Sequence, residues 1–390
     1  MAKRTVKRRG DKGRKARASG RKAPRAAKPS APRRPRPAAR RRSSPAKGAP
    51  GGEAAVANPL LVEVTRGDMV ESRHRMAIAI VDAAGKAVER WGDTERPIYA
   101  RSAIKPLQAL PLLETGAAER YGLEDHEIAL ACASHSGEPQ HTERVAAWLA
   151  RIGCTPEDLE CGPQLPYDEK TGGRLIVNGG KAAAIYNNCS GKHTGFLSTA
   201  RHKGEPTRGY IRSEHPVQRR IAKVLGEMAG LDLSRAPRGI DGCGIPVIGM
   251  PLRAMALALA RLADPAKLPA ERRAAAERIL AAMMCAPEMV GGSGRFGTRL
   301  VQATGHRFAL KGGAEGIYAA ILPDLGLGVA LKADDGTGRA AEVAMARVLV
   351  RLKLIRADAA ARLADLLTPP VVNRAGLEIG RIRPVAGAGF

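Results

Sequence analysis

Long apolar runs and aromatic residues are both scarce in this sequence. Aromatic residues make up 3% of its 390 residues, and no apolar run reaches the roughly 18 residues that a membrane helix requires. The N-terminus is charged but no apolar segment follows it, so no secretory signal is expected. Six cysteines are too few and too scattered for the disulfide framework of a small secreted domain. These absences favour a cytoplasmic protein without a membrane span.

Acidic residues are almost missing from the first 50 positions, where twenty Lys and Arg stand against one acid, Asp11. This segment therefore carries +19 of the formal net charge of +26. It has almost no large apolar residue, so it cannot bury enough surface to offset the entropy lost on ordering. We predict a disordered basic tail over residues 1–57 and a folded domain over residues 58–390. Residues 1–50 have the charge to bind nucleic acid or an anionic surface, although a solvated tail without a partner is the simpler alternative.

The folded part has strand patterns at both ends and helix patterns between them. Strands are predicted at 60–65, 74–82, 87–91, 307–310, 317–322 and 328–332. Helices are predicted at 107–113, 142–152, 194–201, 217–228, 252–262, 270–284 and 338–354. Residues 153–180 are rich in Gly and Pro, which predicts a long ordered loop. This order predicts an α+β fold, in which an antiparallel sheet is flanked by helices and accompanied by a helical subdomain.

Ser102 and Lys105 form a Ser-x-x-Lys pair at the start of a predicted helix, where Pro106 fits the first turn. Positions i and i+3 share a helix face, so the Lys105 amine can reach the Ser102 hydroxyl. A lysine with a lowered pKa can take the hydroxyl proton and create a nucleophile. Free N–H groups at a helix start stabilise an oxyanion. The pair is short and arises by chance, so a surface helix start with Ser102 as N-cap is the alternative.

The stretch Gly292–Gly297 fits the dinucleotide-binding pattern Gly-x-Gly-x-x-Gly. The pattern binds a dinucleotide only when it follows a strand and opens a helix of a βαβ unit. No strand is predicted before it, so we expect a flexible loop rather than a nucleotide site.

Four further stretches place serine, cysteine and lysine beside glycines. They are Cys132–Glu138, Asn187–His193, Ile240–Pro246 and Leu310–Gly316. Together with the Ser-x-x-Lys pair, they resemble the motifs of the bacterial L-asparaginase II family, also called the Rhizobium-type asparaginases. The resemblance runs over most of the chain after the tail. It implies a serine β-lactamase/penicillin-binding-like fold and an asparaginase II catalytic domain over residues 58–390. It also implies an amidohydrolase that releases L-aspartate and ammonia from L-asparagine.

The resemblance implies two serine–lysine couples, Ser102 with Lys105 and Ser134 with Lys311. One serine would attack the side-chain amide carbon and form an acyl-enzyme that water hydrolyses. The sequence leaves open which serine attacks, and its helix-start position favours Ser102. The glycines after Lys311 would let a substrate approach the strand closely.

The resemblance further implies residues around the substrate. Asp241 would hold the substrate amine or assist proton transfer. Arg101 is a candidate for the substrate carboxylate, because a guanidinium grips a carboxylate with two parallel hydrogen bonds. His193 stands beside these residues and would bind weakly, orient a neighbour or cap the structure.

A zinc site formed by Cys189, Lys192 and Cys243 is also implied by the resemblance. Cys189 and Lys192 are spaced i, i+3 and can converge, and thiolates suit zinc. The lysine would have to lose its proton, which demands a strongly shifted pKa. Without the resemblance, two distant cysteines are more often buried apolar residues than ligands. A homodimer is a further implication of the family.

Three functions therefore compete. The first is asparagine hydrolysis, and the second is a glutaminase or another serine–lysine acyl hydrolase on the same fold. The third is an inactive homologue that binds nucleic acid through its basic tail.

Overall fold

A computed structural model of the chain describes residues 57–390. The predicted basic tail and its binding to nucleic acid therefore fall almost wholly outside the described residues and stay predictions. Within the described part of the chain, no helix is long and apolar enough to cross a membrane.

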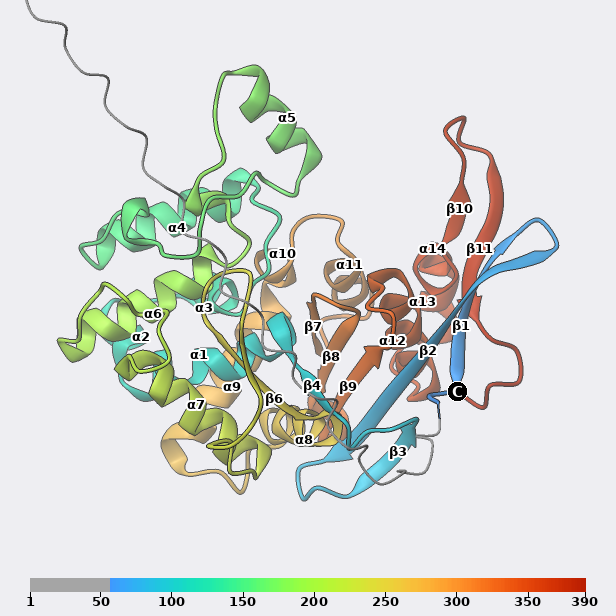
Figure 1. Cartoon of the computed structure of the whole chain (residues 1–390), viewed down its shortest axis with the longest axis horizontal. Coiled ribbons are helices and arrows are strands. Elements are labelled where there is room, and N and C mark those ends of the chain that lie inside the picture. The colour runs from blue at the N-terminus through green and yellow to red at the C-terminus, as the bar shows by residue number, and fades with distance from the viewer. Residues whose placement is uncertain (1–56) are drawn as a thin grey trace, which may run out of the picture. The chain divides into compact units, whose positions relative to one another are not determined.

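The centre of the fold is an antiparallel sheet built from both ends of the described chain. Its strands follow the order β10-β11-β1-β2-β9-β8-β7, and β3 also pairs with β2. Figure 1 shows the first and last strands side by side. This arrangement confirms the predicted α+β fold with an antiparallel sheet. The strands are β1 (Leu60–Arg66), β2 (Met69–Asp82), β3 (Ala87–Trp91), β7 (Ala309–Gly313), β8 (Ile317–Leu322), β9 (Leu327–Ala333), β10 (Pro370–Val372) and β11 (Glu378–Pro384).

Helices cover both faces of the sheet. Side chains of β2 alternate between the two faces, so Ala77 and Ala79 join one hydrophobic cluster while Ile78 and Ile80 join the other. Helix α8 (Leu252–Ala263) packs on the first face, and α12 (Gly338–Arg351) packs on the second. The close approach of α8 requires Gly328 of β9, because a Cβ there would lie 2.1 Å from the Ala256 carbonyl oxygen.

The remaining helices form a subdomain beside β7 and a C-terminal group on the α12 side (Figure 1). A small sheet with the order β4-β6-β5 joins the subdomain. The elements are β4 (Pro97–Tyr99), α1 (Lys105–Glu114), α2 (Ala117–Arg120), α3 (Asp125–Ala131), α4 (Pro139–Arg151), α5 (Glu169–Val177), α6 (Ser190–Lys203), α7 (Pro216–Ala229), β5 (Arg238–Ile240), β6 (Pro246–Pro251), α9 (Ala270–Cys285), α10 (Pro287–Val290), α11 (Phe296–Ala303), α13 (Ala357–Arg362) and α14 (Ala364–Leu367).

Three segments differ from the sequence-based expectation. Helix α11 begins at Phe296, inside the Gly292–Gly297 stretch that was expected to be a flexible loop. Residues 153–180 contain the helix α5, whose first turn is capped by the Asp168 carboxylate accepting from the Thr171 N–H at 2.8 Å. Two adjacent glycines hide its helical pattern in the sequence. Helix α6 begins at Ser190 rather than Thr194, which places Lys192 and His193 in its first turn.

Candidate active site

A cavity of about 460 Å³ lies where β7, α11 and α12 meet the loops of the helical subdomain. Both serines of the predicted couples line it, and so does Lys311. Lys105 lies behind the wall and is fully buried. The structure thus brings together residues from three distant segments of the sequence, namely Ser102 with Lys105, Ser134 and Lys311.

The Ser134 hydroxyl is the point where both lysines converge. Its Oγ lies 3.0 Å from Lys105 Nζ and 2.8 Å from Lys311 Nζ. Ser134 sits in the segment that follows α3, and its backbone N–H donates to the Val290 carbonyl at 2.9 Å. That bond fixes the height of the hydroxyl above β7. Ser134 is only half-buried, so the hydroxyl meets both the lysines and the cavity.

The Lys105 amine has three hydrogen-bond acceptors. Its Nζ donates to the Ala133 carbonyl, to Ser134 Oγ and to Cys189 Sγ, the last at 3.1 Å. A protonated lysine has three N–H donors, and here each one has a partner. The arrangement fits a fixed ammonium that holds the Ser134 segment against the start of α6.

The environment of the Lys311 amine favours the neutral form. Burial lowers the pKa of Lys311 well below its usual value, and the neighbouring charge of Lys105 lowers it further. Its Nζ has only two acceptors, Ser134 Oγ and the Gly312 carbonyl at 2.8 Å. A neutral amine donates to the carbonyl and leaves its lone pair for the Ser134 proton. Lys311 therefore has the environment of a general base.

Ser102 lies on the same cavity wall but is not bonded to Lys105. It belongs to the short 3-10 turn η1 (Arg101–Ile104) that precedes α1. Among residues 57–390 its hydroxyl has no hydrogen-bond partner, and the Lys105 amine points to Ser134 instead. Gly313 of β7 lets this turn approach, because a Cβ there would lie 3.1 Å from the Ala103 nitrogen. Gly313 thus accommodates protein backbone, whereas Gly312 faces the Tyr318 ring, with a Cβ there 3.0 Å from it.

Arg101 and Asp241 form a pair beside this turn. Arg101 Nε donates to Asp241 Oδ1 at 2.9 Å, and the same oxygen accepts from the Gly242 N–H. Burial would raise the pKa of Asp241, but Lys192, the Gly242 N–H and Arg101 together hold it below its usual value. Both residues line a second, much smaller cavity rather than the main one. Arg101 has φ 47°, a left-handed conformation that costs energy for a non-glycine residue.

His193 is buried behind the site rather than exposed in it. Its Nδ1 bonds to the Tyr210 hydroxyl at 2.8 Å, and within the described residues its Nε2 has no partner. Burial lowers the pKa of His193 well below its usual value, so the ring is neutral. His193 does not line the main cavity.

Two thiols and an amine meet at the start of α6. Lys192 Nζ lies 3.0 Å from Cys243 Sγ. A hydrogen bond with Cys243 holds the pKa of Cys189 well below its usual value, and Lys105 and Lys192 add to this effect. The pKa of Cys243 is raised by the same hydrogen bond. Each thiol has one lysine beside it, Cys189 with Lys105 at 3.1 Å and Cys243 with Lys192 at 3.0 Å.

The chemistry of this donor set fits a thiophilic metal only with Lys192 as a ligand. Among residues 57–390, no group of three or more His, Cys, Asp or Glu could hold a metal. Two cysteines supply the sulfur ligands that zinc favours. Burial opposes the charged form of Lys192, yet the two cysteines raise its pKa, so a metal would have to displace its proton.

Sequence analysis missed one residue that supports Ser134. His135 is fully buried, and its Nδ1 accepts from the Gly137 N–H at 3.1 Å. Its Nε2 therefore carries the proton and donates to Ser190 Oγ at 2.9 Å. The ring joins the Ser134 segment to the first residue of α6. The position of His135 directly after Ser134 was the available signal.

It also missed Arg295 and Glu342, two charged residues on the cavity wall. Arg295 precedes α11, and Glu342 lies in α12. Neither belongs to a motif that carries chemistry, so the sequence offered no signal for them beyond the Gly-rich loop before Arg295.

The chain belongs to the L-asparaginase II family, whose model matches residues 62–384. The match covers most of the part of the chain that the structure describes. No curated protein sequence matches the chain.

Several solved structures are similar to the chain at low identity. The crystal structure of Mglu in its native form aligns with a TM-score of 0.40 and 14% identity, covering 72% of this chain and 61% of that one. This chain thus spans less than two thirds of Mglu. A β-lactamase from Mycobacterium bovis aligns with a TM-score of 0.35 and 16% identity over 75% of this chain and 95% of its own. The D-alanine carboxypeptidase AmpC from Burkholderia cenocepacia aligns with a TM-score of 0.32 and 12% identity over 67% and 88%.

Proposed function

We propose that this protein hydrolyses the side-chain amide of L-asparagine through a serine activated by lysine. The observation that carries the proposal is the convergence of Lys105 and Lys311 on the Ser134 hydroxyl at 3.0 and 2.8 Å. The cavity in front of Ser134 supplies room for a small amide. Family membership supports the amide as the reacting group.

The contacts favour Ser134 as the attacking group, whereas its helix-start position had favoured Ser102. Lys311, neutral in its buried place, accepts the Ser134 proton. Lys105 donates to the oxygen that becomes the nucleophile and stabilises its charge. Ser102 faces the same cavity, where its hydroxyl can donate to the substrate or carry a proton.

The reaction then has two halves. Ser134 Oγ bonds to the amide carbon, and the tetrahedral intermediate expels ammonia, which takes the proton held by Lys311. The enzyme is left as a serine ester of the substrate. Lys311, neutral again, takes a proton from water, and the resulting hydroxide attacks the ester. The ester bond then breaks and L-aspartate leaves. The Ser134 oxygen recovers the proton that Lys311 took from water.

Asp241 and Arg101 have a positioning role in this proposal. Their ion pair fixes the backbone directly before Ser102. The pair lies off the main cavity, so it acts through the turn rather than on the amide.

We also propose that Cys189, Lys192 and Cys243 hold a zinc ion. When bound there, the ion would be held by the two cysteine sulfurs and the Lys192 amine, and it would supply a Lewis-acidic positive charge. Cys189 accepts a hydrogen bond from Lys105, which links the two groups of residues. The catalytic steps above use the chain's own residues.

The catalytic proposal is tested by ammonia release and by the position of the acyl group. The purified full chain is expected to release ammonia from L-asparagine faster than from L-glutamine. Rapid acid quenching followed by peptide mapping by mass spectrometry should find the aspartyl ester on Ser134. An ester on Ser102 would instead make Ser134 a proton carrier, and no ammonia from either amide would overturn the proposed function.

The zinc proposal predicts that Cys189→Ser and Cys243→Ser each reduce bound zinc from about one ion per chain to almost none. Metal content after dialysis, measured by plasma mass spectrometry, checks this. Cys285→Ser is the matched control, because Cys285 is exposed and distant from the site in the sequence. Adding zinc to the metal-free chain should release protons, because Lys192 must lose one. Equal zinc in all three variants would contradict the assignment.

A further inference from the structure

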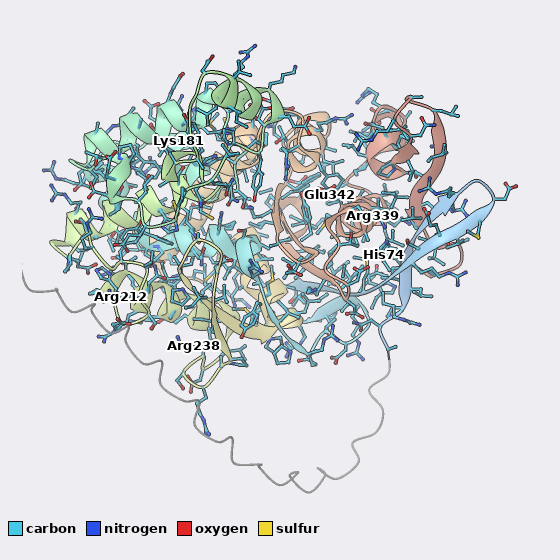
Figure 2. All side chains as sticks on the ribbon, turned by 45° about the horizontal axis from the view of Figure 1, so that its top comes forward. His74, Lys181, Arg212, Arg238, Arg339 and Glu342 are labelled. Carbon is cyan, nitrogen blue, oxygen red and sulfur yellow. The ribbon has the colours of Figure 1, made fainter. Side chains whose placement is uncertain are left out.

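Two charged side chains on the cavity wall have no partner in the described part of the chain. Arg295 forms neither an ion pair nor a side-chain hydrogen bond there, and neither does Glu342. Arg101, by contrast, is paired with Asp241 beside a separate, smaller cavity. Figure 2 labels Glu342 on α12, one turn after the exposed Arg339. Arg295 is exposed and Glu342 is half-buried, so both charges in this one cavity are open to a ligand.

The two groups influence each other without touching. Burial raises the pKa of Glu342, and the charge of Arg295 lowers it in part. An ionised carboxylate that is partly buried costs free energy unless a cation or donor meets it. The space between the two groups therefore suits a ligand with one positive and one negative end.

Arg295 also lies close to the reacting groups. Its charge contributes to the lowered pKa of Lys311, which in turn contacts Ser134. Arg295, Glu342 and the Ser134 hydroxyl therefore line one continuous space. L-asparagine carries an ammonium and a carboxylate on the carbon next to its side chain, so its zwitterionic end and its amide can occupy the two parts together.

The segment that carries Ser134 also holds Arg295 in place. Glu138 accepts from both the N–H and the hydroxyl of Ser293 at 2.8 Å. Ser136 Oγ donates to the Gly291 carbonyl at 3.0 Å. Gly292 has φ 129°, and a Cβ there would lie 2.4 Å from Ser136 Oγ. The Gly-rich loop therefore fixes Arg295 relative to Ser134.

We propose that Arg295 and Glu342 form the subsite for the α-carboxylate and α-ammonium groups of an amino-acid substrate. This inference rests on the proposed function, since it places the rest of the substrate around the amide. A guanidinium meets a carboxylate with two hydrogen bonds, and Glu342 meets the ammonium. Arg101, held by Asp241 outside the cavity, is then a structural arginine.

Three substrates distinguish the contact of Arg295 with the carboxylate from the contact of Glu342 with the ammonium. L-asparagine has both charges, succinamate lacks the ammonium, and 3-aminopropanamide lacks the carboxylate. Glu342→Gln should lower kcat/KM for L-asparagine about tenfold to a hundredfold, mainly through KM, and leave succinamate unchanged. Arg295→Met, assayed at a pH where Lys311 is neutral in both variants, should do the same for L-asparagine and leave 3-aminopropanamide unchanged. Arg295→Lys, which keeps the charge near Lys311, should recover part of the activity.

Matched controls exist for both changes. Arg339→Met removes an exposed arginine from α12, and Glu277→Gln removes an exposed acid from α9; neither residue lines the cavity. Both control variants should behave as wild type. Equal losses on all three substrates in Glu342→Gln and Arg295→Met would overturn the subsite, because a general structural defect does not distinguish substrates.

A binding measurement separates this inference from the proposed reaction. L-aspartate should raise the melting temperature of the wild-type chain, and Glu342→Gln and Arg295→Met should each remove most of that shift. If wild type hydrolyses none of the amides but the shift follows this pattern, the amino-acid subsite stands and the reaction proposal fails. If wild type hydrolyses L-asparagine and neither change alters kinetics or shift, the subsite is wrong and the reaction stands.

Discussion

Lys311→Arg is expected to lower kcat/KM for L-asparagine by about a thousandfold or more while the fold is retained. The reason is that the amine must be neutral to accept the Ser134 proton at 2.8 Å. An arginine remains protonated at every working pH, so it cannot act as a base. Lys311→Met, neutral but without a lone pair, should be equally inactive. Substantial activity in Lys311→Arg alone would show that the residue acts through its charge.

The pH dependence of the wild type follows from the same amine. Because burial and Lys105 lower the pKa of Lys311 well below 10.5, the amine is neutral over a range where an exposed lysine is charged. Activity should be lost as the pH falls through this lowered pKa, since the base becomes protonated. The acid limb of the profile of kcat/KM against pH measures the lowered pKa of Lys311. A limb near the pKa of an exposed lysine would contradict the assignment of Lys311 as the base.

The pH dependence of the free energy of unfolding tests the lowered pKa of Lys311 independently, and the direction of its change can be predicted. The unfolded chain binds a proton at Lys311 below about pH 10.5, whereas the folded chain resists it down to the lowered pKa. The stability contributed by Lys311 is therefore complete above the unfolded pKa and decreases as the pH falls towards the folded one. Relative to wild type, Lys311→Met should gain stability on going from high to neutral pH. Chemical unfolding at several pH values checks this trend.

The sequence predicted the helices and strands of this fold better than the contacts between them. Helices α7, α8, α9 and α12 have apolar residues at regular spacing, and the strands at both ends alternate, so local patterns were sufficient. Helix α5 was missed because its two glycines lower helix propensity. Its formation depends on the Asp168 cap and on tertiary contacts.

The same difference holds for the candidate site. Short motifs located the serines, lysines and cysteines, because each sits beside glycines in a recognisable stretch. The partners of Lys105 could not be predicted, since its side chain reaches the Ala133 carbonyl and the Ser134 hydroxyl of another segment rather than Ser102. Arg295 lies in a Gly-rich stretch whose pattern gave no catalytic role, Glu342 lies in a helix without a motif, and only folding brings them to one cavity.

Gly191→Ala is expected to destabilise the chain by about 1–3 kcal/mol and to lower activity with it. Gly191 lies in the first turn of α6, where a Cβ would stand 2.5 Å from the Leu130 carbonyl oxygen of α3. Neither backbone can move alone. α6 carries Lys192, and α3 leads to Ser134, so a shift between the helices displaces the two groups relative to each other.

Gly195→Ala, one turn later on the same buried helix, is the matched control. The nearest atom to a Cβ there is Leu112 Cδ2 at 3.4 Å, an ordinary contact with a side chain that can adjust. Alanine also favours a helix over glycine by roughly 1 kcal/mol, so this variant should be as stable as wild type or more so. Urea unfolding and ammonia release measure both variants. Equal stability of the two would contradict the tight packing of α6 on α3, because the glycines differ in little else than the atoms they face.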